Sequence, residues 1–211
     1  MFGPRSAVVI VSIPILVANT LLLITGWRVV PRVLRDIAPM LVLGAIGAFL
    51  GVQLLAQLDQ RVFAALISVL VIVFLLRGDR LLGDDPEARR LKVAGPAVGF
   101  VGGVLQGSTS IASPLVGSYF HARKLSAKEF VVVLAALFQL NSIVQIGGFL
   151  AFDLLTPDLL ALGVAGLVPN LVGLIAGIEA RGRISAQAFR RVITVLLMAS
   201  VVNLLWRAVA S

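Results

Sequence analysis

Residues 95–120 read GPAVGFVGGVLQGSTSIASPLVGSYF, an apolar stretch that is interrupted near its centre by the polar run Gln106-Gly107-Ser108-Thr109-Ser110. The stretch is long enough to enter a bilayer, but it is polar where a plain spanning helix is most apolar. Lipid offers the backbone no hydrogen bonds, so a broken helix persists at membrane depth only where protein surrounds it or where it lines a wet cavity. Broken helices of this kind mark the substrate sites of many transporters. The alternative is a kinked structural helix whose Ser and Thr hydroxyls bond to the preceding turn.

The composition indicates an integral membrane protein. Of the 211 residues, 59% are hydrophobic and 13% are charged, and the mean hydropathy is +1.06, which is far too apolar for a soluble domain of this length. The net charge of +8 would suggest nucleic acid as the partner of a soluble protein. Here the Arg and Lys residues flank membrane segments, so membrane lipid is expected and nucleic acid is not. With no Cys and one His, we expect neither a metal site nor a cofactor.

Apolar runs predict the membrane helices. They are separated by short loops rich in charge, Gly and Pro, which leaves no room for a soluble domain, so residues 1–211 are expected to form one transmembrane domain. Six runs flank the broken segment, three on either side: Ser6–Gly26, Ile37–Leu58, Val62–Leu76, Glu129–Phe152, Thr156–Ile178 and Gln187–Trp206.

An internal repeat relates the two halves of the chain. Sliding the sequence against itself by 122 positions superposes glycines, a buried-type Asn and loop charges: Asn19 on Asn141, Gly26 on Gly148, Asp36 on Asp158, Gly44 on Gly166, Gly51 on Gly173 and Arg61 on Arg183. The repeats are residues 1–92 and 93–211. The counterpart of the broken segment would begin about thirty residues before Met1, since 92 − 122 = −30. We therefore expect the first repeat to be incomplete at its N-terminus, either because the true start lies upstream or because this protein lacks that element.

The distribution of basic residues favours a hairpin over a crossing. If residues 95–120 cross the membrane, the 18 Lys and Arg residues divide nine to nine between the faces. If the segment dips in and returns, 15 lie on one face, and only Arg5, Arg61 and Arg207 lie on the other. The second division is a strong positive-inside signal. It predicts an all-α, multi-pass protein of the cell's inner (cytoplasmic) membrane, with two inverted repeats of three transmembrane helices and a re-entrant broken hairpin that opens the second repeat.

Two stretches resemble a known family of permeases. The Gly-rich segment that ends in Pro114-Leu115, followed by SAKEFVVVLAALFQLNSI at Ser126–Ile143, is similar to the second-half signature of the sulfite exporter TauE/SafE family. The stretch Gly44–Leu76 looks like the region that closes the first half of those proteins. The resemblance implies a permease for sulfite, thiosulfate, a sulfonate or another small sulfur anion. Family members usually carry a first Gly-rich re-entrant segment, which is absent here, and further glycines where this chain has residues 106–110.

The expected binding groups for such an anion lie at the break. The second half-helix presents N–H groups without internal partners, and its dipole points its positive end at the same place. Hydroxyl and amide side chains at the break would add donors, and buried amides on neighbouring helices would either bond those helices or line the path. Pro169-Asn170 interrupts another apolar run and either opens carbonyls toward the cavity or only kinks the helix. The candidate substrate-binding residues are Gln106, Gly107, Ser108, Thr109, Ser110, Asn141, Asn19, Gln139, Gln145 and Asn170.

Other functions fit the sequence less well. An enzyme would need clustered His, Asp or Glu at membrane depth, and the acidic residues lie at the ends of segments. We therefore expect no catalytic residues. An anion channel and a non-transporting partner subunit remain as alternatives. The sequence leaves open which anion moves, in which direction, with which coupling ion, and whether the chain forms a homodimer.

Overall fold

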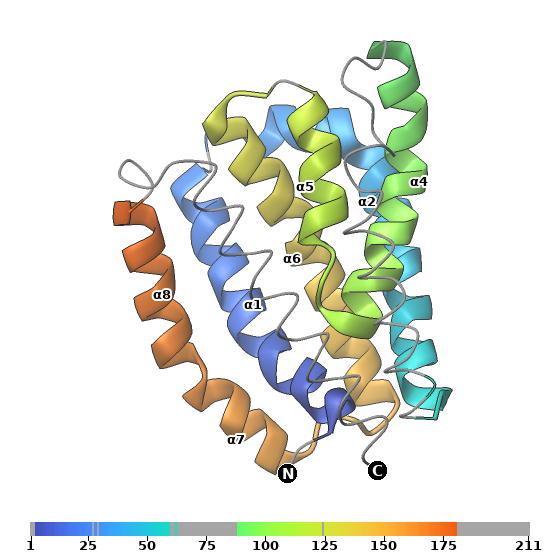
Figure 1. Cartoon of the computed structure of the whole chain (residues 1–211), viewed down its shortest axis with the longest axis vertical. Coiled ribbons are helices and arrows are strands. Elements are labelled where there is room, and N and C mark those ends of the chain that lie inside the picture. Colours follow the sequence, from blue (N-terminus) through green and yellow to red (C-terminus); the bar gives the residue numbers. More distant parts are fainter. Residues whose placement is uncertain are drawn as a thin grey trace.

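A computed structural model describes residues 3–26, 28, 30–59, 62, 88–123 and 125–180, and every structural statement below concerns these residues. They form helices and no strands (Figure 1). Four stretches are long and apolar enough to cross a membrane, namely Pro4–Gly26, Ile37–Gln57, Glu129–Ala151 and Pro157–Gly177. The helices are α1 (Pro4–Gly26), α2 (Val30–Gln57), α4 (Ala88–Thr109), α5 (Ser113–Ala122), α6 (Ala127–Ala151), α7 (Pro157–Ala165) and α8 (Leu167–Ala180).

Most predicted helices agree with the observed ones. The expected runs Ser6–Gly26 and Glu129–Phe152 are α1 and α6, and the run Thr156–Ile178 is divided into α7 and α8. Ser126 begins α6 with a capping box, because its hydroxyl accepts from the N–H of Glu129 and the Glu129 carboxylate accepts from the N–H of Ser126. The predicted helices 62–76 and 187–206 lie outside the described residues, apart from Val62.

Contacts between glycines and facing residues give the helix directions. Gly26 of α1 lies against Val132 of α6, and Thr20 bonds Gln139, so α1 and α6 run in opposite directions. On α2, Gly44 lies against Leu137 and Asn141 of α6, and eight residues later Val52 contacts Gly148. Therefore α2 and α6 run in the same direction, as Figure 1 shows.

The two helices that flank the break form a hairpin. Gly95 of α4 faces Tyr119 of α5, whereas Gly102 faces Val116, so residues later in α4 meet residues earlier in α5. The two helices are therefore antiparallel, and α5 returns to the end at which α4 begins (Figure 1).

The break occurs later than the sequence predicts. Residues 106–109 were expected to be non-helical, but α4 continues through Thr109, and the break comprises Ser110, Ile111 and Ala112. The polar residues stay helical because the hydroxyls of Ser108 and Thr109 donate to carbonyls of the preceding turn, at 2.6 Å and 2.8 Å. Ser110 then takes a left-handed conformation with φ of 58°, which ends the helix.

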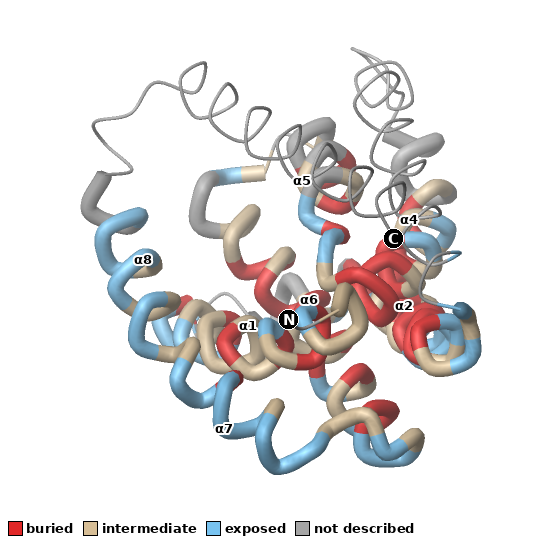
Figure 2. Tube along the Cα trace, turned by 60° about the horizontal axis from the view of Figure 1, so that its bottom comes forward, coloured by how far each residue is buried: buried red, intermediate tan, exposed pale blue. Residues whose placement is uncertain are grey.

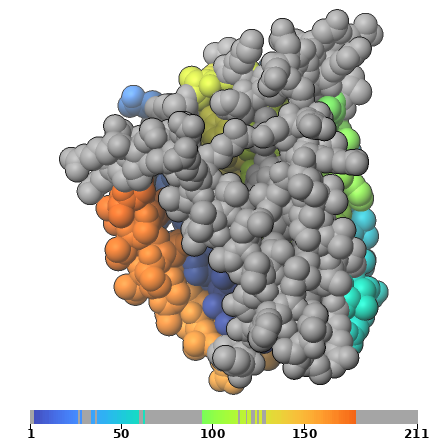
Figure 3. All heavy atoms as spheres, in the orientation of Figure 1, coloured from blue at the N-terminus to red at the C-terminus, as the bar shows by residue number. Residues whose placement is uncertain are grey.

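The predicted interruption at Pro169-Asn170 is a kink. The N–H of Gly166 still donates to Leu162 O and that of Asn170 to Gly166 O, but Pro169 has no N–H for the carbonyl four residues before it. The helix therefore bends at Gly166, between α7 and α8. Both helices lie along α1 on one flank of the molecule (orange in Figures 1 and 3), with α2 on the opposite flank.

The most closely packed pair of helices is α2 and α4. A Cβ atom on Gly103 would overlap the carbonyl oxygen of Gly44, and one on Gly107 would overlap that of Ala48. Gly44, Gly47 and Gly51 of α2 also allow close packing. A Cβ on Gly47 or Gly51 would overlap the α4 backbone, and one on Gly44 would crowd α6 and Gly99. Gly173 and Gly177 differ, since no described atom lies within 4 Å of a Cβ at either position.

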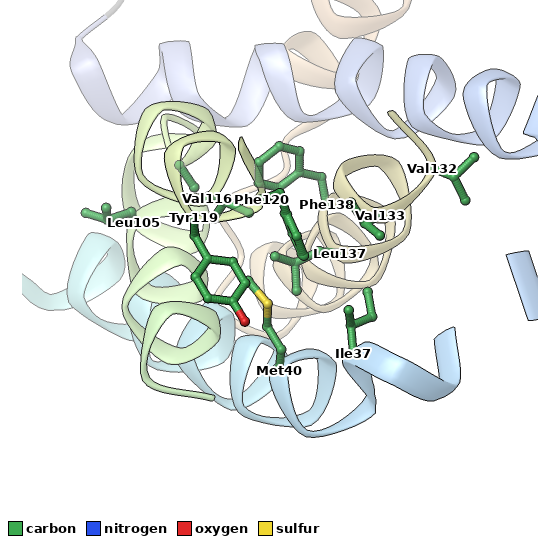
Figure 4. Packing of buried hydrophobic residues seen from close by; sticks show 11 residues of the cluster. Ile37, Met40, Leu105, Val116, Tyr119, Phe120, Val132, Val133, Leu137 and Phe138 are labelled. Atoms are coloured by element: carbon green, nitrogen blue, oxygen red, sulfur yellow. The ribbon is translucent and has the colours of Figure 1, made fainter. Parts of the chain in front are cut away.

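Buried residues gather where α2, α4, α5 and α6 meet, whereas α7 and α8 are largely exposed (Figure 2). One apolar cluster centres on Tyr119, Phe120 and Leu137, whose side chains converge with Met40 of α2 (Figure 4). A second cluster at the other end joins Val9 of α1, Val52 and Leu55 of α2, and Phe149 of α6. Ala112, the last residue of the break, belongs to the first of these clusters.

Candidate functional site

The centre of the candidate site is the side-chain amide of Gln145, which is 0% exposed on α6. Its Nε2 donates to Gln106 O at 2.7 Å and to Gly107 O at 3.2 Å, and it lies 3.1 Å from the Oγ of Ser110. These atoms are the end of α4 and the first residue of the break. Gln145 therefore fastens α6 to the point where the hairpin turns.

Because of this contact, the two helix ends at the break differ in how many of their backbone groups have hydrogen-bond partners. The last carbonyls of α4 carry the negative end of its dipole, and the first N–H groups of α5 carry the positive end. The Gln106 carbonyl accepts from both Gln145 and the N–H of Ser110. In α5, Val116 N donates to Ala112 O, but helix geometry provides no intrahelical acceptor for the N–H groups of Ser113 and Leu115. The break thus offers free donors and partly neutralised acceptors, which suits an anion better than a cation.

The polar residues of α4 are oriented differently from the sequence-based expectation. The hydroxyl protons of Ser108 and Thr109 are directed at their own helix, and Thr109 Oγ1 also accepts from the N–H of Ile111 at 3.0 Å. Gly107 is pressed against the backbone of Ala48, and Gln106 is 2% exposed. The geometry therefore favours backbone N–H groups over these two hydroxyls as the donors at the break.

Asn141 lies one helical turn from Gln145 on the same face of α6. Its side chain is 0% exposed, and its Oδ1 lies beside Gly44 of α2. Neither its Oδ1 nor its Nδ2 has a hydrogen-bond partner among the described residues. The Oγ of Ser142, also 0% exposed, is likewise without a partner. Sequence reasoning missed Ser142, although its place next to Asn141 and three residues before Gln145 is a signal that could have found it.

Two further candidates lie along the seam between α1 and α6. Gln139 Nε2 donates to Thr20 Oγ1 at 3.0 Å, and its Oε1 is buried without a partner in the described part of the chain. Asn19, the repeat mate of Asn141, is 7% exposed and has an unpartnered Nδ2. The Thr20–Gln139 bond also places Asn19 and Asn141 at nearly the same level along the bundle. Because α1 and α6 are antiparallel, Asn19, one residue before Thr20, and Asn141, two residues after Gln139, are displaced from this bond toward the same end.

Asn170 is apart from the other candidates. It lies on α8, which packs against α1 and α7, and its Oδ1 is buried without a partner among the described residues. The structure thus brings residues 106–110 and Gln145 together at the break, with Asn141 one turn away and Asn19 and Gln139 on a neighbouring seam.

The elements around the break carry no ionisable side chain in their central parts. Residues 6–26, 37–57, 93–118 and 130–151 contain no Asp, Glu, His, Lys, Arg or Tyr. Within the described residues there is also no group of three or more His, Cys, Asp or Glu that could hold a metal ion. The polar groups that these stretches place around the break are therefore neutral dipoles.

Comparison with known proteins gives one match. The model of the family described as sulfite exporter TauE/SafE matches residues 1–204. No match was found among curated proteins or among solved structures.

Proposed function

The chain belongs to the sulfite exporter TauE/SafE family of membrane transporters, and from this premise we propose that it is a secondary transporter for a small sulfur anion such as sulfite, thiosulfate or a sulfonate. The expected location is the cytoplasmic membrane. The observation that carries the proposal is the hairpin break, where Gln145 satisfies the carbonyl end of α4 and the N–H end of α5 stays free.

The depth of the break supports a re-entrant hairpin. Gln145 lies 16 residues after Glu129 and six residues before Ala151 in the candidate span Glu129–Ala151, which corresponds to about 24 Å and about 9 Å at 1.5 Å per residue. The hairpin therefore reaches well past the middle of α6 before α5 turns back. Non-helical backbone at that depth requires surrounding protein or a wet cavity, and α2 and α6 supply such surroundings.

The helix directions support inverted repeats. A shift of 122 places α1 over residues 126–148, close to α6 at Ala127–Ala151, and α2 over residues 152–179, close to α7 and α8 at residues 157–180. In each pair the two mates run in opposite directions. For the second pair, the contacts of Gly163 with Ile13 and of Gly166 with Pro14 show that α7 is parallel to α1. Because α2 is parallel to α6, and α6 is antiparallel to α1, α7 is antiparallel to α2. Opposed repeats are the arrangement from which alternating access is built.

The roles follow from the geometry. The N–H groups of Ser113 and Leu115 bind anion oxygens, and Gln145 holds the break in shape. Asn141 and Asn19 provide further neutral donors along the path, with Gln139 beside them. Neutral donors bind an anion weakly enough to release it, which a carrier requires.

The direct test is flux of labelled sulfite, thiosulfate, sulfate and methanesulfonate into proteoliposomes that contain the full chain. We expect saturable flux of at least one sulfur anion. Flux that rises linearly with concentration would indicate a channel, and absence of flux for every anion would contradict the proposal.

A pair of proline variants tests the backbone donors. Ser113→Pro removes one N–H from the first turn of α5, a position at which helices accept proline, and should raise the KM for the transported anion about tenfold through the loss of one charge-assisted hydrogen bond. Ser6→Pro makes the same change in the first turn of α1, outside the site, and should leave KM unchanged. An unchanged KM in Ser113→Pro would exclude this N–H as a donor.

A further inference from the structure

The orientation of the Gln145 amide is fixed by its partners. Carbonyl oxygens only accept hydrogen bonds, so Gln106 O and Gly107 O require that the nitrogen of the amide face them. Its oxygen, Oε1, must then point elsewhere. This atom is buried and has no hydrogen-bond partner among the described residues.

Two kinds of group therefore lack a partner on the elements that meet at the break. The first turn of α5 supplies N–H donors, and Gln145 Oε1 supplies an acceptor. A fully deprotonated oxyanion has acceptors alone, so it would leave Oε1 unpaired. An oxyanion that keeps one O–H can accept hydrogen bonds from the N–H donors through its oxygens and donate a hydrogen bond from its O–H to Oε1. Each unpartnered group of the site then has a partner on the anion.

The described residues offer no proton carrier near this point. The four stretches packed around the break contain no ionisable side chain. On the same elements, the ionisable residues occupy positions at or near the helix ends: Arg5 on α1, Arg32, Arg35 and Asp36 on α2, Arg89, Arg90 and Lys92 on α4, Tyr119, His121 and, just beyond, Arg123 on α5, and Lys128 and Glu129 on α6. A carboxylate relay of the kind used by many proton-coupled transporters is thus missing from these elements.

Building on the proposed function, we propose that the transported species is the monoprotonated form of a sulfur oxyanion, of the hydrogen sulfite type, and that Gln145 Oε1 selects it by accepting a hydrogen bond from its O–H group. The substrate then carries its own proton. One proton crosses with each anion, so transport is coupled to the pH gradient without a titrating residue in the protein.

The test uses the full chain in proteoliposomes. Initial rates are measured at constant total sulfite while the pH is raised through the second ionisation of sulfurous acid, with protein-free liposomes subtracted because neutral sulfur dioxide crosses lipid. We expect the rate to fall in step with the hydrogen sulfite fraction. Methanesulfonate has the same charge and three oxygen acceptors on sulfur but no O–H group. Its flux should therefore be about tenfold lower, the effect of losing one buried hydrogen bond, and independent of pH.

The outcomes separate this inference from the proposed function. Sulfite flux that does not follow the hydrogen sulfite fraction, or methanesulfonate flux equal to it, would overturn the inference and leave the transporter intact. Absence of flux for every sulfur anion would overturn the proposed function, and this inference with it.

Two variants locate the acceptor. Gln145→Met keeps the length of the side chain but has no amide oxygen, so the preference for hydrogen sulfite over methanesulfonate should fall from about tenfold to near one. Ser12→Ala removes a buried hydroxyl that bonds its own helix on α1, and should keep the preference. A folded Gln145→Met protein with an undiminished preference would overturn the assignment of Oε1. If this variant does not fold, the pH profile and the methanesulfonate comparison of the unmodified protein decide the question.

Discussion

At the scale of the residue, the hairpin depends on one buried amide. Gln145 joins α6 to two carbonyls that lie 38 and 39 residues away in the chain. A helix that ends inside protein must find partners for its last carbonyls, because water is not there to supply them. Gln145 is therefore a structural link, and under the proposed function it also determines which helix end is available to an anion.

Gln145→Leu should lower the free energy of unfolding by about 1–3 kcal/mol, the cost of leaving buried carbonyls without a donor. Gln139→Leu is the matched control, because it removes a single hydrogen bond at a half-buried position and should cost about 1 kcal/mol or less. Thermal unfolding in detergent measures both. Equal losses of unfolding free energy in the two variants would contradict the role of Gln145 as the donor to the buried carbonyls at the break.

The left-handed residue Ser110 gives a second prediction. Its φ of 58° is strained for residues with a side chain. Ser110→Val should therefore destabilise the protein by about 1–2 kcal/mol, because a β-branched residue tolerates this conformation poorly. Ser110→Gly should be close to neutral, because relief of backbone strain offsets the lost contact between Oγ and Gln145. Comparison of the two melting temperatures tests this, and a valine variant as stable as the glycine variant would contradict it.

At the scale of the element, α2 and α4 form one closely packed unit. Glycines on both helices allow carbonyl oxygens of one to rest on the Cα atoms of the other. Because helices in lipid gain little from hydrophobic association, this backbone contact is a main source of their stability. It also holds the end of α4 at the height of Gln145.

Gly103→Ala should separate α2 from α4, because the new methyl group would overlap the carbonyl of Gly44 and approach the N of Ala48 to 2.9 Å. Backbone cannot move aside as a flexible side chain can, so we expect a loss of about 1–3 kcal/mol. Gly147→Ala on α6 is the control, since nothing lies within 4 Å of a Cβ there, and it should stabilise the helix by up to about 1 kcal/mol. A Gly103→Ala protein as stable as the Gly147→Ala protein would refute the packing argument.

At the scale of the whole molecule, the described helices place Arg28, the start of α4 and Arg123 at one end, and the α6–α7 loop at Asp153 at the other (Figure 1). The ends of the hairpin thus share a side with the loop between α1 and α2. This arrangement agrees with the topology expected from the distribution of basic residues, in which most of the positive charge lies on the face that we expect to be cytoplasmic.

The absence of cysteine makes the topology directly measurable. Single cysteines at Arg28, Ala88 and Arg123 should react with a membrane-impermeant maleimide only when the cytoplasmic face is exposed, as in inverted vesicles. A cysteine at Asp153 should react only from the opposite face. If Ala88→Cys and Arg123→Cys were labelled from opposite faces, the segment would cross the membrane and the re-entrant hairpin would be wrong.

The sequence alone determined that this is a helical membrane protein, where α1, α6 and the kinked pair α7 and α8 lie, and that residues 95–120 hold a broken helix. These features depend on composition and on the order of apolar and polar residues, which are local properties. The sequence also indicated the break, but placed it at residues 106–110, because polarity by itself does not show that Ser108 and Thr109 bond back to their own helix.

The tertiary structure decided which polar residues meet. Gln139 and Gln145 are the same residue type, six positions apart on one helix, so they face directions that differ by about 120°. One reaches Thr20 on α1, and the other caps α4. Likewise, Asn141 lies against Gly44 of α2, while Asn170 lies on α8 beside α1. Helix packing determines which residues dozens of positions apart form a hydrogen bond, and no local sequence pattern shows it. The sequence could therefore identify the candidate residues, but only the packing could show which of them meet at the break.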